Sequence, residues 1–409
     1  MKILILSMSL LMLLMANKGA PKETLEQKAA RIHRSVLTID THCDTPISLT
    51  KPGFNLAERH DAKTSGTQLD FPRMQEGGLD APFFAVFLGQ GPRTKEGNES
   101  AINQAIEIIH TINRNVEASP ELAQMARSPE DAYTLKKNGK RAIYMGIENG
   151  YAIGNDLSMV EKFWQMGIRY MTLCHTSNND LCDSSLGKKG AEYNGLSPFG
   201  EAVVREMNRV GMMVDVSHIS DSSLFDVLRI TKLPVIASHS CARAICDHPR
   251  NISDKGLIGI AKNGGVIQMC FLGDYVRAAE VNPARDSSIA VINTRYNHFK
   301  ELTPEREKAG RDELVAVTLK YPQHTANVQD VVNHIDHMVK VAGIDHVGIG
   351  TDLDGGGGVE GCSDVSMMGN VTLELVRRGY TEEQIGKIWG GNLMRVFKAV
   401  LKGAIHDHK

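Results

Sequence analysis

The chain has 409 residues, of which 42% are hydrophobic and 23% are charged, as in an ordinary folded globular protein. Its formal net charge is only −2, so we expect neither nucleic acid nor an acidic membrane surface as a partner. The length would allow two or three domains, but a single α/β barrel often uses about 250 residues or more.

Residues 1–20 have the layout of a secretory signal peptide. Lys2 precedes an apolar run over residues 3–15, and small residues follow it up to Ala20. The run is short for a transmembrane helix, no cysteine directly follows it to take a lipid, and the C-terminal end has no apolar tail. We therefore predict a protein without a stable membrane anchor, cleaved near Ala20 and exported to the periplasm or secreted.

The seven cysteines are scattered along the chain without a CxxC motif. An odd number leaves at least one thiol unpaired even in an oxidising compartment, and we predict no particular pairing. Cys43, Cys174, Cys241 and Cys270 lie on or beside predicted strand ends, where a buried thiol commonly packs as a small apolar side chain.

Eight short runs have the pattern of parallel strands, after an amphipathic helix predicted over residues 22–34. Most are nearly continuous apolar runs, which is typical of strands buried on both faces. Helical patterns between them include residues 100–115, 198–210, 220–229 and 328–341. The alternation predicts an α/β fold, a (β/α)8 TIM barrel over residues 21–402 with a tail at 403–409. The predicted strands are 36–42, 83–88, 141–148, 168–175, 212–218, 234–239, 264–270 and 346–352.

Two segments are longer than the connections of a bare barrel. Residues 52–80 are rich in glycine, aspartate and charge, and we expect an ordered excursion near the mouth of the barrel. Residues 277–326 are too long for a simple strand–helix connection and contain a helix pattern at 303–320. We predict an insertion on the C-terminal face of the barrel, serving as a lid or an oligomer contact.

Residues of metal-ligand type follow six of the predicted strands at their C-terminal ends, where barrel enzymes place their chemistry. Four imidazoles and three carboxylates at one rim suit a borderline divalent metal, zinc first, with manganese or cobalt able to substitute. Seven groups exceed one tetrahedral site, so two ions sharing a carboxylate would use them better. The residues are His42, Asp44, Glu148, His175, His218, His239 and Asp352.

Each of these residues taken singly has a structural interpretation. A histidine that ends a strand is more often a hydrogen-bonded core residue, and Glu148 could cap the next helix. Asp352 and Asp354 could form a turn before the glycines that follow them, and Arg250 could be a surface cation. Recurrence at the ends of six different strands favours the site instead, because capping residues have no reason to gather there.

Eight motifs stand along the chain between about residue 30 and about residue 400. They are IDTHCDT (39–45), GIENG (146–150), YMTLCHTSNN (170–179), VDVSHIS (214–220), ASHSCAR (237–243), HPRNISD (248–254), GIGTDLDG (348–355) and WGGNLMRV (389–396). In this order they resemble the renal (membrane) dipeptidase family of zinc peptidases. The resemblance implies that His42 and Asp44 bind one Zn²⁺ ion, that His218 and His239 bind a second, and that Glu148 bridges both.

The same resemblance implies the roles of the substrate-binding residues. His175 would contact the scissile carbonyl and the oxyanion that develops from it, and Arg250 with Tyr275 would hold the free carboxylate of the substrate. Asp352 would handle a proton near the amino end of the substrate. The implied activity is hydrolysis of small dipeptides, with tolerance of a D-residue at the C-terminal position and sometimes opening of β-lactam rings, by a homodimer.

The chain departs from the mammalian members by lacking a lipid-anchor tail, by its 277–326 insertion and by its disulfide pattern. Two other interpretations stay open. One is a different binuclear-metal barrel amidohydrolase acting on a lactone, a cyclic amide or a phosphoester, although such enzymes often carry a carboxylated lysine on strand 4, where this chain has His175. The other is a catalytically silent barrel, which a missing metal residue would have favoured; none is missing.

Overall fold

The computed structural model describes residues 23–404 except 52, 279, 300–301 and 322–324. The predicted signal peptide and residues 405–409 of the predicted tail lie outside the described residues. No helix in the described part combines the length and the apolarity that crossing a membrane requires.

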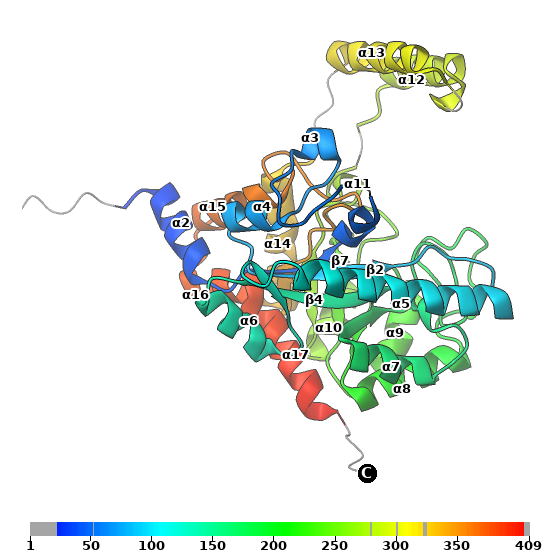
Figure 1. Ribbon diagram of the computed structural model, residues 1–409, viewed down its shortest axis with the longest axis vertical. Helices are drawn as coiled ribbons and strands as arrows, with labels where there is room; N and C mark the ends of the chain where they lie inside the picture. Colours follow the sequence, from blue (N-terminus) through cyan, green and yellow to red (C-terminus); the bar gives the residue numbers. More distant parts are fainter. Residues whose placement is uncertain (1–22, 52, 279, 300–301, 322–324, 405–409) are drawn as a thin grey trace, which may run out of the picture.

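A ring of eight parallel strands forms the centre of the molecule (Figure 1). The ring closes between its first and last strands, because Asp352 N–H donates to the His42 carbonyl at 3.0 Å and Asp44 N–H donates to the Leu353 carbonyl at 2.8 Å. The predicted (β/α)8 barrel is therefore confirmed. In ring order the strands are β1 (Ile39–Cys43), β2 (Ala81–Phe87), β4 (Arg141–Glu148), β5 (Ile168–Thr172), β6 (Met213–Asp215), β7 (Ile236–Ser240), β8 (Val266–Met269) and β9 (Val347–Ile349).

The sequence pattern missed one strand and placed three strand ends three residues too late. The short strand β3 (Ala123–Met125) pairs with β4 outside the ring. Strands β5, β6 and β9 end at Thr172, Asp215 and Ile349. His175, His218 and Asp352 therefore lie in the loops that follow rather than on the predicted strands. His218 has a φ of 68°, which an extended strand cannot contain.

Helices surround the ring, and several begin directly after a capping serine. Ser197, Ser220 and Ser253 each accept a hydrogen bond from the backbone N–H three residues later, which satisfies a donor that the first helical turn leaves free. The surrounding helices are α2 (Leu25–Ser35), α5 (Lys95–Glu117), α6 (Pro129–Lys137), α7 (Ser158–Met166), α8 (Pro198–Val210), α9 (Asp221–Ile230), α10 (Asp254–Lys262), α14 (Val328–Ala342), α15 (Gly369–Arg377), α16 (Glu382–Gly386) and α17 (Asn392–Gly403).

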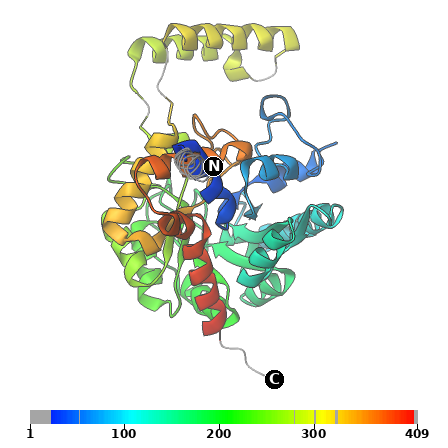
Figure 2. The ribbon, with the colours of Figure 1, turned by 90° about the vertical axis from the view of Figure 1, so that its left-hand side faces the viewer.

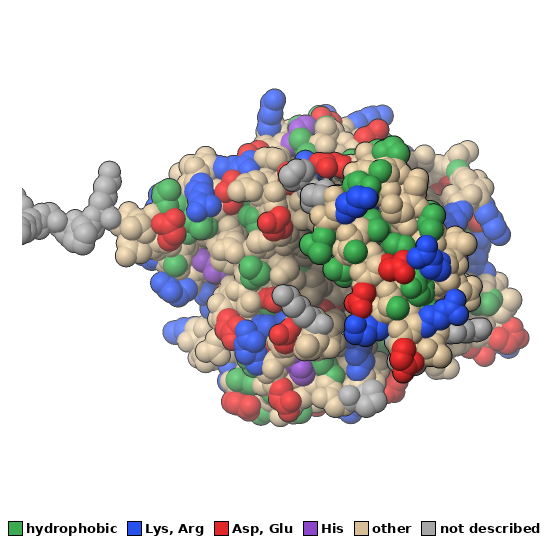
Figure 3. All heavy atoms as spheres, turned by 90° about the horizontal axis from the view of Figure 1, so that it is seen from above, with side chains coloured by type: hydrophobic (Ala, Val, Ile, Leu, Met, Phe, Trp, Pro, Cys, Tyr) green, Lys and Arg blue, Asp and Glu red, His purple; other side chains and the backbone are tan. Residues whose placement is uncertain are grey.

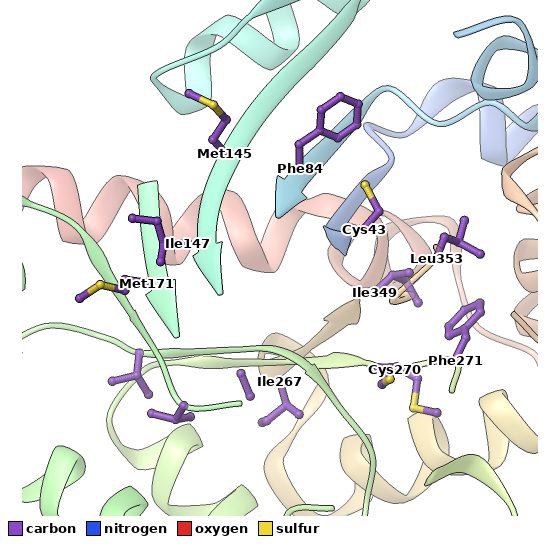
Figure 4. Close-up of a cluster of buried hydrophobic side chains, with 14 of the residues drawn as sticks. Cys43, Phe84, Met145, Ile147, Met171, Ile267, Cys270, Phe271, Ile349 and Leu353 are labelled. Carbon is purple, nitrogen blue, oxygen red and sulfur yellow. The ribbon is translucent and has the colours of Figure 1, made fainter. Parts of the chain in front are cut away.

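Alternation along the strands divides the core into two layers. On β4, Met145 and Ile147 pack in the layer between strands and helices, which Figure 4 shows. Tyr144 belongs to a second cluster with Phe83, Tyr170 and residues of α17. Helix α17 lies at the end of the barrel away from the helices of residues 283–320 (Figure 1). Glu148 shares the side of Tyr144 and so points into the barrel. All seven cysteines are buried free thiols.

The two long segments lie at the C-terminal end of the ring. Residues 52–80 include α3 (Ala62–Ser65) and α4 (Phe71–Gly77), and their Gln68 exchanges backbone–side-chain hydrogen bonds with Asp354 in the loop after β9. The insertion leaves the barrel after α11 (Gly273–Val276) and forms two helices, α12 (Pro283–Arg295) and α13 (Pro304–Lys320). These helices, here called the arm (residues 283–320), stand clear of the barrel in Figures 1 and 2.

Candidate metal centre

All seven predicted ligand-type residues converge at the C-terminal end of the ring. Their nitrogen and oxygen atoms form three overlapping groups, each with its atoms within 4.8 Å of one another. The groups are His42, Glu148 and His239; Glu148, His175 and His218; and His42, Asp44 and Asp352. Six of the seven side chains are buried and His175 is partly buried, so the groups form a shielded polar cluster.

Glu148 stands between the two sides of this cluster. Its Oε2 atom lies 3.3 Å from Nε2 of His42, which also lies 3.6 Å from Oδ2 of Asp44. Its Oε1 atom lies 3.1 Å from Nε2 of His218 and 3.6 Å from Nε2 of His239. One carboxylate oxygen therefore faces each ligand pair, which is the arrangement that a bridging carboxylate requires.

Irregular backbone aims the side chains of the cluster. The pairing register shifts between Asp40 and Cys43, on either side of His42, and again between Ala237 and Ser240, on either side of His239. Such shifts next to active sites redirect a side chain from the regular alternation. His218 and Asp352 adopt positive φ angles of 68° and 64°, a conformation that non-glycine residues adopt mainly at constrained functional positions.

A buried tyrosine supports His42 from inside the barrel. Nδ1 of His42 lies 2.8 Å from the hydroxyl of Tyr170, so Nε2 faces the carboxylates. The ring of Tyr170 fits because residue 146 is glycine: a β-carbon there would stand 2.1 Å from Cζ of Tyr170. Neither Tyr170 nor this function of Gly146 was predicted, although both residues lie within the quoted motifs.

The donor set fits divalent metal ions. Nε2 of His42 and Oδ1 of Asp44 are buried and make no hydrogen bond within the described part of the chain, a costly state for atoms that do not meet a ligand. Mixed imidazole and carboxylate donors suit zinc and similar ions.

The ionisation of His218, His239 and Glu148 also suits metal ligands. Burial and the charge of Arg250 lower the pKa of His218, and burial with the charge of His42 lowers the pKa of His239, so both favour the neutral form. Burial opposes the ionisation of Glu148, but His42 and His218 hold its pKa well below the ordinary value. Burial raises the pKa of Asp352 well above its ordinary value, and the neighbouring Cys270 adds to this effect.

A cavity of about 300 Å³ opens onto the cluster, with Glu148, His175 and Asp352 among the side chains that line it. The side chains of Ile47, Phe87 and Leu272 contribute apolar surface to its wall, and none of them was predicted. Phe87 is the last residue of β2 and meets the His175 ring edge to face at 5.0 Å. The position of Phe87 at a strand end could have indicated that it faces the site. In the sequence, however, an apolar residue at a strand end looks the same as a core residue.

The two residues predicted at the carboxylate end lie side by side, but only Tyr275 lines this cavity. Tyr275 lines it, whereas Arg250 is only 3% exposed and lies over the Tyr275 ring at 5.8 Å. Arg250 donates to the His239 carbonyl at 2.7 Å and to Ser240 Oγ at 2.9 Å. Its Nε atom has no hydrogen-bond partner in the described structure, so the guanidinium keeps a donor for another group.

A parallel barrel with a histidine and carboxylate cluster at its C-terminal rim defines a metal-dependent hydrolase of the barrel type. The family model for membrane dipeptidases, peptidase family M19, matches residues 26–407. The chain belongs to this family and is a metallo-dipeptidase.

Named relatives agree with this assignment. Dipeptidase tcpJ of Claviceps purpurea is 31% identical over 337 residues, which cover 81% of this chain and 69% of that protein. The structure of the probable dipeptidase PvdM from Pseudomonas aeruginosa is 30% identical with a TM-score of 0.80, covering 94% of this chain and 100% of that one. A metallo peptidase from Rhodobacter sphaeroides, liganded with a phosphinate mimic of the dipeptide L-Ala-D-Ala, shares the fold with a TM-score of 0.71 at 22% identity, covering 89% and 99% of the two chains.

Proposed function

We propose that this metallo-dipeptidase uses two Zn²⁺ ions, one held by His42 and Asp44 and the other by His218 and His239, with Glu148 between them. The observation that carries the proposal is the division of the Glu148 carboxylate, one oxygen toward His42 and the other toward His218 and His239. Bound metal would supply a Lewis acid and a water whose pKa is lowered to about 7.

The remaining residues of the cluster have separate tasks in this proposal. Asp352 takes the proton of the attacking water at its carboxylate and passes it to the leaving amine. Burial supports this task, because it raises the pKa of Asp352 and so makes its carboxylate a better proton acceptor. His175, partly exposed at the cavity, donates to the oxygen of the scissile carbonyl as negative charge develops there.

The free carboxylate of the substrate is proposed to meet Arg250 and Tyr275. A guanidinium matches a carboxylate in shape and charge, and Nε of Arg250 has no other partner in the described structure. A cation held against Tyr275, a wall residue of a cavity of about 300 Å³, favours short peptides with a free C-terminus.

We further propose that a D-residue is accepted at the C-terminal position. The related fold of the Rhodobacter sphaeroides peptidase was solved with a mimic of L-Ala-D-Ala, which supports testing that substrate here.

The deciding experiment measures the release of free amino acids from L-Ala-L-Ala and L-Ala-D-Ala by purified, zinc-loaded protein, together with its metal content. We expect two zinc ions per chain and cleavage of both dipeptides. If protein that holds two metals cleaves neither dipeptide, a lactone or cyclic amide is favoured as the substrate. One metal per chain would refute the proposal that two ions share Glu148.

We also propose that the protein is exported after cleavage near Ala20. N-terminal sequencing of the protein from the exported fraction tests this proposal.

We propose further that the protein acts as a homodimer. The arm supports an oligomer contact, because Val291, Val315 and Leu319 are 56%, 56% and 78% exposed. Hydrophobic side chains gather over the arm beside a hollow in the surface (Figure 3). Light scattering of wild-type protein and of a Val315→Asp, Leu319→Asp variant tests the dimer contact: a dimer that persists in the variant would leave the arm as a lid.

A further inference from the structure

Asp215, the last residue of β6, is a fully buried carboxylate outside the ligand groups described above. Its Oδ1 atom accepts from the backbone N–H groups of Ser217 at 3.0 Å and Ser238 at 2.8 Å. Its Oδ2 atom accepts from the hydroxyls of Thr172 at 2.5 Å and Ser238 at 2.6 Å. A carboxylate has about four lone-pair positions, so these four donors hold Asp215 rigidly and leave it no capacity for a metal ion.

The hydroxyl of Ser238 connects this carboxylate to His239. Ser238 Oγ lies 2.8 Å from Nδ1 of His239. An ionised carboxylate only accepts hydrogen bonds, so the hydroxyl hydrogen of Ser238 is directed to Asp215. The oxygen of Ser238 must then accept from Nδ1–H of His239, which leaves the lone pair of this imidazole on Nε2. That atom lies 3.6 Å from Oε1 of Glu148 and 2.7 Å from Nε2 of His218.

The other two imidazoles of the proposed ligand set lack this support. Nδ1 of His218 is buried and has no hydrogen-bond partner in the described structure. Nδ1 of His42 meets the hydroxyl of Tyr170, which can donate or accept. Among the three histidines, His239 is therefore the one whose tautomer and ring orientation a fixed acceptor determines.

We propose that Asp215 and Ser238 are positioning residues that hold His239 as a neutral Nε2 ligand and thereby set the affinity of one of the two metal positions. This inference rests on the proposed two-metal function. Hydrogen bonds to the second nitrogen of a metal-binding histidine commonly change metal affinity about 10–100-fold.

The chain offers a matched pair of variants. Ser238→Ala removes the link to His239 together with one hydroxyl bond to Oδ2 of Asp215. Thr172→Val removes the other hydroxyl bond to the same oxygen, with little change in shape and without a contact to His239. Both residues are fully buried, so the two variants lose a comparable bond to Asp215 and differ in the connection to the imidazole.

The measurement is Co²⁺ binding to metal-free protein, by competition with a chelator and by the visible absorption of the bound ion, after circular dichroism has shown that each variant is folded. We expect Ser238→Ala to lower the affinity of one equivalent about 10–100-fold, leave the other close to wild type and alter the spectrum. Thr172→Val should bind both equivalents within about twofold of wild type, and Ser238→Thr should restore part of the loss because it keeps a hydroxyl.

Equal losses of Co²⁺ affinity in Ser238→Ala and Thr172→Val would overturn the inference, because they would show that Asp215 supports only the fold. Wild-type affinity in Ser238→Ala would also overturn it. Failure of the two-metal proposal is distinguishable, since it would appear in wild-type protein as fewer than two equivalents of bound Co²⁺ before any variant is compared.

Discussion

Gly355 lies against the carboxylate of Asp44 so closely that a β-carbon on Gly355 would stand 2.1 Å from Asp44 Oδ2. The same β-carbon would stand 2.4 Å from Oδ1 of Asp352. Contacts of this length do not occur between non-bonded atoms, so the loop after β9 can approach the cluster only as glycine.

Gly355→Ala should therefore displace Asp44, Asp352 or the loop that carries Gly355. We expect kcat/KM and metal affinity to fall about 10–100-fold, the range found when groups around metal ligands are disturbed. Gly273→Ala is the control, because Gly273 directly follows Leu272 of the cavity wall and a β-carbon there meets nothing within 4 Å. Metal content and steady-state kinetics of both variants check the prediction; wild-type values in Gly355→Ala would contradict it.

Replacement of Arg250 tests the carboxylate end of the cavity. Loss of a hydrogen bond to a charged group costs about 1.5–3 kcal/mol, so Arg250→Ala should reduce kcat/KM for dipeptides about 10–100-fold. Bound metal should stay near the wild-type level. Arg243→Ala is a nearby control that removes a cation paired with Asp221 at 2.7 Å instead. Equal losses of metal and turnover in Arg250→Ala would show that Arg250 only supports the His239 carbonyl.

Gly146→Ala tests the space occupied by Tyr170. The added β-carbon would overlap the Tyr170 ring, which is fully buried, and the ring cannot move away without disturbing His42. We expect a loss of about 1–3 kcal/mol in the free energy of unfolding, as for other overpacked cores. Gly369→Ala, where a β-carbon meets nothing within 4 Å, should change stability by less than about 0.5 kcal/mol. Urea denaturation of the metal-free proteins provides the measurement, and equal stabilities would refute the steric argument.

His334 predicts a pH dependence of stability. Its Nδ1 accepts from Ala242 N–H at 3.0 Å, so its Nε2 carries the hydrogen and donates to the Val276 carbonyl at 2.8 Å. Burial lowers the pKa of His334 in the folded protein, so below about pH 6.5 the unfolded chain binds a proton that the folded protein resists. The contribution of His334 to the free energy of unfolding is therefore complete above about pH 6.5 and declines as the pH falls toward the lowered pKa.

The replacement His334→Gln should reduce stability at pH 7.5 and flatten its decline toward pH 5.5. Urea denaturation at both pH values checks this expectation. His110→Gln, at an exposed position of α5, should keep the wild-type decline. If the free energy of unfolding fell equally in His334→Gln and in wild type between the two pH values, another group would be responsible for the decline.

The sequence by itself determined the barrel and the residue types of its metal centre. Eight apolar runs predict parallel strands buried on both faces, and parallel strands in a closed ring bring all their C-terminal ends to one rim. The meeting of His42, Glu148, His218 and His239 could therefore be inferred from their order along the chain, although residues far apart in sequence carry them.

Only the tertiary structure decided which other groups touch this centre. Strands β5, β6 and β9 end earlier than the apolar pattern, because a pattern of burial does not show where backbone pairing stops. The contacts of Gly355 with Asp44, of Tyr170 with His42 and of Ser238 with both Asp215 and His239 depend on loop conformation and on side-chain directions across strands. These are set by packing between distant segments, and no local spacing in the sequence encodes them.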